Sequence, residues 1–195
     1  MKLLLLAASF ACVLTPKAFA QYNIVVNTGG AVNCVTSPTE RGFAAFSWSV
    51  GGTVNVGSVA GVLRSSKPSL SSIQITKNID QCSSPQLQHY FFAATHFPTV
   101  VVTQYRNVGT ATPQTVAVVT LTDASLTEYS LSGTTDSPAA ENLAFVFGKL
   151  CIRDYTYDSS GRGTSTQACY NVNTQIETPT SILLNSKSEL LRQTK

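Results

Sequence analysis

Two histidines are the first residues to weigh for chemistry, because imidazole can act as a general base or as a metal ligand near neutral pH. His89 and His96 are seven residues apart, and on one continuous helix they would lie two turns apart on the same face. A simpler interpretation places His89 on the polar side of a helix and His96 in the segment that leaves it. We therefore expect neither a catalytic nor a metal-binding role for them.

Other catalytic patterns are not found in the sequence. There is no G-x-S-x-G turn of the kind that presents a nucleophilic serine. The segment Gly161-Arg162-Gly163-Thr164 lacks the lysine and the spacing of a phosphate-binding loop, and a hairpin turn explains it better. Asp80 and Asp123 are expected to form turns, while Asp136 and Glu141 flank a loop. We predict a protein that is not an enzyme and that binds no cofactor.

An aromatic stripe offers a binding function as an alternative. Tyr155 and Tyr157 alternate along one expected strand, and Tyr170 is expected across a hairpin from one of them. Aromatic rings can stack on a sugar or a base, but cross-strand aromatic pairs also stabilise sheets. We favour the stabilising role.

The N-terminus has the features of a secretory signal. A positive start at Lys2 precedes an apolar run over residues 3–14, and Ala18-Phe19-Ala20 is a small-x-small site. We expect residues 1–20 to be removed by cleavage after Ala20, and the mature protein to be secreted or periplasmic without membrane insertion. A membrane anchor would need about 20 apolar residues.

Removal of this leader changes the number of cysteines from five to four, because Cys12 lies within it. An even number in an oxidising compartment suggests two disulfides, with three possible connectivities. The sequence lacks the C-x-x-C spacing that would indicate a metal site. The four remaining cysteines are Cys34, Cys82, Cys151 and Cys169.

The spacing of these cysteines favours one connectivity. Residues 144–157 and 167–174 flank a turn-rich segment and predict a hairpin centred near Ser160. Cys151 and Cys169 stand nine residues either side of Ser160, so symmetric pairing would bring the two sulfurs together. Cys34 would then pair with Cys82.

Composition limits the other functions. The chain is 43% hydrophobic and 12% charged, which indicates one folded domain, expected over residues 21–177, followed by a tail at 178–195. Lys2 and Lys17 lie in the leader, so the mature chain keeps 11 of the 13 basic residues and has 10 acidic residues. This near-neutral balance argues against binding to nucleic acid or to an anionic membrane.

Residues 71–106 predict a strand, a helix and a second strand. Ile73 and Ile75 alternate with polar residues, as in a half-buried strand. Ser83 or Ser84 is expected to cap a helix of about ten residues, which Pro98 would end. A strand over residues 99–105 should follow. The apolar face of the helix would comprise Leu87, Tyr90, Phe91 and Ala94.

The rest of the mature chain is expected to be mainly β. Strands are predicted at residues 22–27, 43–50, 115–122, 124–132 and 143–152, with a loop at 133–138. Residues 51–69 are rich in Gly and Ser and predict a long loop with room for a β-ribbon. Strands at this spacing indicate a sandwich or a barrel.

Several motifs, in their order and spacing, resemble those of the haemolysin-coregulated proteins (Hcp), the tube proteins of type VI secretion systems. The resemblance covers roughly residues 23–175. The central motifs are Ile75-Thr76-Lys77-x-Ile79-Asp80, Ser84-Pro85-x-Leu87 and His96-Phe97-Pro98. The flanking motifs are Phe46-Ser47-Trp48, Val119-Thr120-Leu121-Thr122-Asp123, Tyr129-Ser130-x-Ser132-Gly133 and Glu141-Asn142-Leu143-x-Phe145-x-Phe147-x-Lys149.

This resemblance implies an antiparallel β-barrel with one short helix packed on its side. It also implies a hexameric ring that stacks into a hollow tube, is expelled by a contractile sheath and can carry effector proteins. No catalysis is attributed to such a domain. The leader and the four cysteines depart from the family pattern, because family tube proteins are made in the cytoplasm without a cleaved leader. A stand-alone secreted binding or structural module, disulfide-bonded and outside any tube, is the alternative.

The tail at residues 178–195 lies outside the resemblance. Residues 181–192 have the pattern of an amphipathic helical turn or two. The tail would dock on the barrel, contact another protomer or fray.

Overall fold

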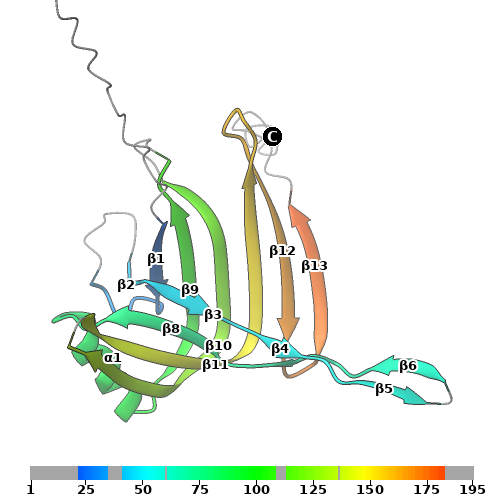
Figure 1. Cartoon of the computed structure of the whole chain (residues 1–195), viewed down its shortest axis with the longest axis horizontal. Coiled ribbons are helices and arrows are strands. Elements are labelled where there is room, and N and C mark those ends of the chain that lie inside the picture. Colours follow the sequence, from blue (N-terminus) through cyan, green and yellow to red (C-terminus); the bar gives the residue numbers. More distant parts are fainter. Residues whose placement is uncertain (1–21, 35–40, 60, 109–112, 136, 183–195) are drawn as a thin grey trace, which may run out of the picture.

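Two strands of 21 residues each, β10 (Gln114–Thr134) and β11 (Ser137–Tyr157), run through the whole fold (Figure 1). They are rich in β-branched and aromatic residues, which favour strands. The computed structural model describes residues 22–34, 41–59, 61–108, 113–135 and 137–182. Within this part of the chain, most other elements are arranged along these two strands or along their neighbours.

A circuit of antiparallel strands forms a nearly closed barrel. β9 (His96–Arg106) pairs with β10, and β1 (Tyr22–Asn27) pairs with β9. On the other side, β8 (Ile73–Asn78) pairs with β11, and β3 (Ser47–Ser49) pairs with β8. A single residue separates β2 (Phe43–Ala45) from β3, and β2 pairs with β1. The predicted fold class, an antiparallel β-barrel with one helix, is confirmed.

The barrel encloses the hydrophobic core. Ile73 and Ile75 are fully buried, so the alternation in β8 predicted its inward face correctly. With these two isoleucines, the largest apolar side chains in the core come from six different elements, which ties the circuit together. The others are Phe43, Phe97, Phe145, Leu87, Leu121 and Leu143.

The sheet continues beyond the barrel. Residues 140–145 of β11 pair with β8, whereas residues 149–157 pair with β12 (Gly163–Asn171). The last strand, β13 (Ile176–Ile182), pairs with β12. We call residues 149–157 together with β12 and β13 the wing. β11 therefore belongs to the barrel at one end and to the wing at the other.

Asp123 lies at a bend within β10. We predicted a turn between two strands here, and a loop at residues 133–138, but β10 continues through Asp123 to Thr134 and β11 begins at Ser137. Asp123 has a φ of 59°, a left-handed conformation that Asp tolerates better than most residues. A Cβ on Gly148 of β11 would lie 3.2 Å from Asp123 Cβ. The small glycine therefore leaves room for the aspartate at the bend.

Helix α1 (Ser83–Phe92) follows β8 and lies against the barrel (Figure 1). The predicted cap was wrong: Ser83 and Ser84 are buried inside the first turn, and Asp80 Oδ1 accepts the N–H groups of Cys82 and Ser83 instead, at 2.8 and 2.5 Å. An aspartate three residues before the helix can reach these donors, which have no intrahelical partner.

The end of α1 also differs from the prediction. The helix stops at Phe92, Ala94 has a φ of 49°, and the Thr95 N–H donates to Tyr90 O at 2.9 Å. Pro98 lies within β9 rather than at the end of the helix. Ala94 is exposed, so it does not belong to the apolar face. The local turn at Ala94 ends the helix before the proline can do so.

Residues 52–70 form a β-ribbon that projects from the barrel (Figure 1). β4 (Gly52–Thr53) pairs with β7 (Ser69–Leu70) at its base, and β5 (Val56–Val59) pairs with β6 (Val62–Ser65) toward its tip. We call this segment the arm. The Gly- and Ser-rich loop with room for a ribbon is thus a ribbon over much of its length.

The C-terminal part of the described chain is a strand, not the start of a tail. β13 reaches Ile182, so the sheet crosses the domain end that we placed at residue 177. The helical turn predicted from Ser181 begins inside β13, where pairing with β12 satisfies the backbone instead. The expected leader at residues 1–20 and residues 183–195 lie outside the described part of the chain.

Candidate functional site

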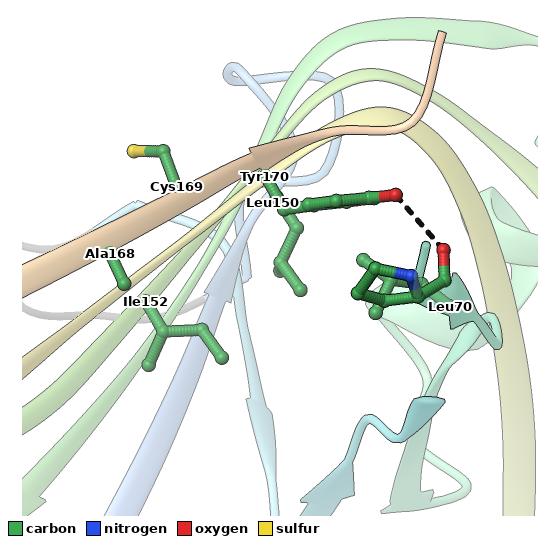
Figure 2. Close-up of a pocket in the computed structure, with 7 residues that line it drawn as sticks. Leu70, Leu150, Ile152, Ala168, Cys169 and Tyr170 are labelled. Atoms are coloured by element: carbon green, nitrogen blue, oxygen red, sulfur yellow. Dashed lines mark hydrogen bonds between the residues drawn. The ribbon is translucent and has the colours of Figure 1, made fainter. Parts of the chain in front are cut away.

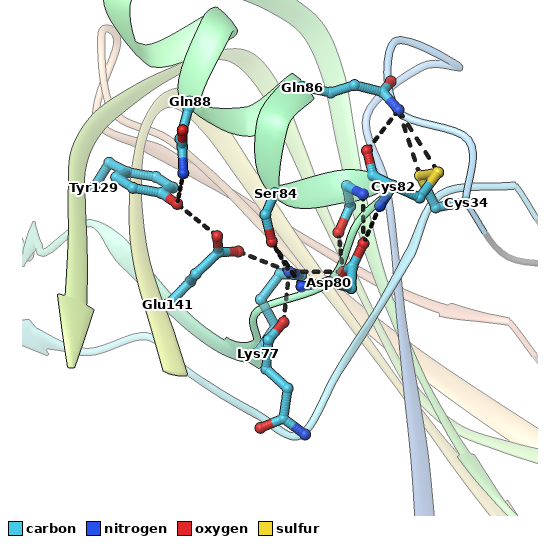
Figure 3. Close-up of polar contacts among 11 residues, drawn as sticks. Cys34, Lys77, Asp80, Cys82, Ser84, Gln86, Gln88, Tyr129 and Glu141 are labelled. Atoms are coloured by element: carbon cyan, nitrogen blue, oxygen red, sulfur yellow. Dashed lines mark hydrogen bonds and ion pairs between the residues drawn. A yellow bond between two sulfur atoms is a disulfide. The ribbon is translucent and has the colours of Figure 1, made fainter. Parts of the chain in front are cut away.

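The residues of the central motif meet in an ion network inside the barrel (Figure 3). Lys77 of β8 and Glu141 of β11 are directly opposite in the strand register. Lys77 Nζ lies 2.6 Å from Glu141 Oε2, and the side chains are 1% and 0% exposed. Burial of two charges is tolerated only when they are paired and hydrogen-bonded.

Three further groups surround the Lys77 ammonium. Nζ lies 2.8 Å from Asp80 Oδ2 and donates to Asn78 O at 2.6 Å and to Ser84 Oγ at 3.1 Å. Ser84 Oγ also accepts the Asp80 N–H at 2.9 Å. The lysine therefore links β8 to the first turn of α1.

Asp80 joins this network to the helix N-terminus. Its carboxylate accepts the side-chain hydroxyl of Ser83 in addition to the two backbone N–H groups. Partial burial raises the pKa of Asp80, but hydrogen bonds from Lys77 and Ser83 outweigh it and hold the pKa well below its usual range. The carboxylate is thus kept ionised where the helix dipole favours negative charge.

Tyr129 extends the network to β10. Its hydroxyl donates to Glu141 Oε1 at 2.5 Å and accepts from Gln88 Nε2 of α1 at 3.0 Å. Burial, together with the hydrogen bond to the Glu141 carboxylate, raises the pKa of Tyr129 to about 12. The tyrosine therefore stays protonated and serves as a donor. The network ties α1 to three strands, which is a structural role.

Sequence reasoning misplaced Glu141 and did not connect Tyr129 with it. We expected Glu141 beside a loop, yet it is buried in β11. One signal was available: Glu141 alternates with Leu143 and Phe145, which are both fully buried. In a strand this spacing puts all three side chains on one face.

Two disulfides cross-link the chain, with the connectivity that the spacing favoured. Cys34 Sγ and Cys82 Sγ are 2.05 Å apart, and Cys151 Sγ and Cys169 Sγ are 2.04 Å apart. Cys151 and Cys169 are opposite each other in the β11–β12 register. The predicted hairpin is therefore present with the expected symmetry.

The first disulfide fastens the loop after β1 to the start of α1. Val32 of this loop is fully buried in the core, and its N–H donates to Thr28 Oγ1 at 3.0 Å. Tyr90 of α1 donates its hydroxyl to Ala31 O at 3.0 Å. The disulfide, the hydrogen bonds and the buried valine all hold this loop against the helix.

The two histidines lie in different elements. His89 is exposed on α1, whereas His96 begins β9, with Nε2 2.5 Å from Asp123 Oδ1. The side chains of this pair are 53% and 62% exposed, so the contact adds little stability. Within the described residues, no three His, Cys, Asp or Glu side chains gather as a metal site would require.

The tyrosines do not form the predicted cross-strand pair. Tyr155 faces Ser165, Tyr157 faces Gly163, and Tyr170 faces Leu150. The Tyr157 ring lies over Gly163, where an added Cβ would come within 3.0 Å of it, and its hydroxyl donates to Thr115 O at 2.9 Å. This tyrosine supports the sheet, which fits the stabilising role.

The arm carries a group of exposed apolar side chains. Leu63 is 77% exposed, and every described side chain of residues 51–69 is exposed. The arm packs none of these side chains into the core of its own protomer. The large apolar residues of the arm with exposed side chains are Val54, Val56, Val62 and Leu63.

A groove of about 250 Å³ lies where the arm joins the wing (Figure 2). Leu150 and Ile152 of β11 and Ala168 of β12 form one wall. Pro68 and Leu70 at the base of the arm form the other, and Tyr170 donates its hydroxyl to Pro68 O at 2.9 Å. The groove is therefore lined mainly by apolar side chains, and one hydrogen bond joins its two walls.

Among the residues that the structure describes, no helix has the length and apolar character needed to cross a membrane.

Comparison with solved structures shows the same fold in other proteins. A type six secretion system protein is 15% identical, with a TM-score of 0.70 over 81% of this chain and 100% of that one. Hcp1 from Salmonella typhimurium is 20% identical, with a TM-score of 0.62 over 80% of this chain and 99% of that one. A type VI secretion system effector from Yersinia pestis is 20% identical, with a TM-score of 0.51 over 78% and 100%.

Comparison with curated proteins gave no match. The family described as "Type VI secretion system effector, Hcp" matches residues 38–153, which is more than half of the chain. This match includes the three central motifs and the residues of the ion network. The chain belongs to the Hcp family.

Proposed function

We propose that this protein is a tube subunit whose protomers join into a hexameric ring and whose rings stack. Membership of the Hcp family and the shared fold support a structural, tube-like role in type VI secretion. Among the described residues, the side chains most suggestive of catalysis are those of the Lys77 network and of the His96–Asp123 pair. The contacts of these side chains are structural. The proposed function is therefore assembly rather than catalysis.

The exposed arm is the observation that carries this proposal. Val56, Val62 and Leu63 of the paired ribbon face solvent, which is unfavourable for apolar side chains. Covering them with another surface would stabilise the protein. The arm projects away from its own barrel (Figure 1), so the covering surface would come from another copy. A contact between two different surfaces of identical protomers is heterologous, and such contacts close into rings or extend into tubes.

The route to this assembly would begin with export. The expected leader at residues 1–20, cleaved after Ala20, and the two disulfides support passage through an oxidising compartment. Ring assembly would then follow oxidation of Cys34, Cys82, Cys151 and Cys169. Effector proteins are the proposed cargo of the tube.

Substitution of the arm tests the proposed assembly. Leu63→Asp places a charge at the most exposed apolar position of the arm and should dissociate rings while the circular dichroism spectrum and melting temperature stay unchanged. Arg64→Ala, at the exposed neighbouring residue, is the matched control and should leave rings intact. Rings that persist with Leu63→Asp would exclude the arm as the contact. If the protein is instead a stand-alone secreted module, the wild type, Leu63→Asp and Arg64→Ala should all be monomers.

A further inference from the structure

The two disulfides of the described chain differ in how easily a thiol can reach them. In the first disulfide, Cys82 is exposed and Cys34 is half-buried. In the second disulfide, Cys151 is half-buried and Cys169 is only 8% exposed. A thiolate breaks a disulfide by attacking one of its sulfur atoms, so access to that sulfur strongly affects the rate. Cys82 therefore offers the easiest point of attack.

The side-chain amide of Gln86 lies beside both sulfurs of the first disulfide (Figure 3). Its Nε2 donates to Cys34 Sγ at 3.5 Å and to Cys82 Sγ at 3.7 Å. The same nitrogen donates to Cys82 O at 2.9 Å, which holds the amide in place. If Cys82 Sγ is attacked, Cys34 Sγ leaves as a thiolate. A nearby N–H donor would stabilise the negative charge that forms on this sulfur.

The second disulfide has a similar donor but a less accessible sulfur. Gln167 Nε2 donates to Cys169 Sγ at 3.3 Å, and Gln167 Oε1 accepts from Arg153 Nε at 2.8 Å. An amide donor is thus common to the two disulfides and does not distinguish them. We therefore expect the difference in access to decide which disulfide is reduced first.

Contacts that do not involve sulfur hold the backbone on both sides of the first disulfide. The Cys34 N–H donates to Gly42 O at 2.6 Å, and Val32, two residues earlier, is fully buried in the core. On the helix side, the Cys82 N–H donates to Asp80 Oδ1 at 2.8 Å. These contacts would remain after reduction. The two thiols would then stay near each other, so that the disulfide could form again.

We propose that the Cys34–Cys82 disulfide is a thiol–disulfide exchange site for a dithiol partner, and that Gln86 stabilises the leaving thiolate. One thiolate of the dithiol attacks Cys82 Sγ, and the electron pair of the S–S bond passes to Cys34 Sγ, which takes a proton from solvent. The second thiolate of the dithiol then attacks the dithiol sulfur of this mixed disulfide and releases Cys82, which is protonated in turn. The dithiol is thereby oxidised to a disulfide, while the protein gains two electrons and two protons. This exchange concerns one protomer and does not rest on ring assembly.

Timed reduction of the full-length oxidised protein with dithiothreitol tests the proposal. Thiols are alkylated at each time point and located by peptide mapping, so that the second disulfide serves as a control in the same sample. The first disulfide should be reduced at least about tenfold faster than the second. The circular dichroism spectrum should stay unchanged, and removal of the reductant should restore the disulfide. Reduced glutathione, quenched with acid, should be trapped on Cys82.

Substitution of Gln86 tests its part in the exchange. Gln86→Leu removes the donor and should slow reduction of the first disulfide by about three- to tenfold, with no change for the second. Gln81→Leu, at the exposed residue before Cys82, is the matched control and should change neither rate. Equal or reversed rates for the two disulfides, glutathione trapped on Cys34, or unfolding upon reduction would overturn the proposal. An unchanged rate in Gln86→Leu would overturn the role proposed for the glutamine.

Discussion

Lys77 of β8 and Glu141 of β11 face each other across the strand register, with Nζ 2.6 Å from Oε2 and neither side chain exposed to solvent by more than 1%. Both residues belong to motifs that resemble the Hcp family, and both are structural. The motifs therefore identify the packing of a barrel and its helix, while the surface proposed for assembly lies elsewhere, on the arm.

Removal of one partner from this pair should be strongly destabilising. Glu141→Gln keeps the shape of the side chain but leaves the Lys77 charge with less compensation in a buried site, and we expect a loss of about 3 to 5 kcal/mol in the free energy of unfolding. Urea denaturation measures this loss. Lys77→Met should cost a similar amount.

The double variant Lys77→Met with Glu141→Leu is the control for this interpretation. It removes both charges, so its cost should be clearly smaller than the sum of the two single costs. A single variant that loses less than about 1 kcal/mol would contradict a buried, mutually dependent pair.

Asp80 should make stability depend on pH. Its pKa in the folded state lies below the ordinary value of 3.8, mainly because hydrogen bonds from Lys77 and Ser83 outweigh its partial burial. The stability that Asp80 contributes is thus present above pH 3.8 and is lost as the pH falls toward the folded pKa. The difference in unfolding free energy between the wild type and Asp80→Asn should therefore be largest near neutral pH.

Urea denaturation at several pH values from 7 down to about 3 checks this expectation. The difference between the two proteins should shrink below about pH 4. A difference that stays constant across the series would show that the carboxylate charge does not support the helix N-terminus.

The two disulfides should differ in their contributions. Cys34 and Cys82 are 48 residues apart and Cys151 and Cys169 are 18 apart, so the chain-entropy relation gives about 4 and about 3 kcal/mol respectively. Paired Cys→Ser variants, compared by urea denaturation in oxidised form, measure both. A larger loss for the Cys151–Cys169 pair would contradict the entropic account.

Gly42 should tolerate no side chain. Its φ is 133°, and a Cβ would lie 2.0 Å from the carbonyl oxygen of Val26. Gly42→Ala must move the backbone between β1 and β2, at an expected cost of at least about 2 kcal/mol. Thermal melting measures it. Gly57→Ala in the arm, where a Cβ meets nothing within 4 Å, should change stability by no more than about 0.5 kcal/mol, and an equal effect at both glycines would contradict the packing described.

Local patterns predicted the strands and the hairpin well. Ile73 and Ile75 alternate inward as expected, and the turn around Ser160 sets the register that brings Cys151 opposite Cys169. Period-two alternation and turn composition depend on nearby residues only, which is why one sequence suffices for them.

Features that depend on distant partners were missed. Asp80 rather than a serine accepts the first N–H groups of α1, because the helix begins at Ser83 and both serines lie within its first turn. Tyr170 reaches the arm rather than another tyrosine. Asp123 looked like a turn but sits in one continuous strand, because pairing with β9 and β11 continues on both sides of it. Apart from the contacts at the start of α1, these interactions join residues that are far apart in the sequence.

The most direct test of the proposed function is the mass of the mature, oxidised protein in solution. Light scattering at high micromolar concentration, with negative-stain microscopy of the same sample, should give one species of six protomers with the outline of a ring. A single species with the mass of one protomer under these conditions would contradict the proposal that this Hcp protein assembles into a tube.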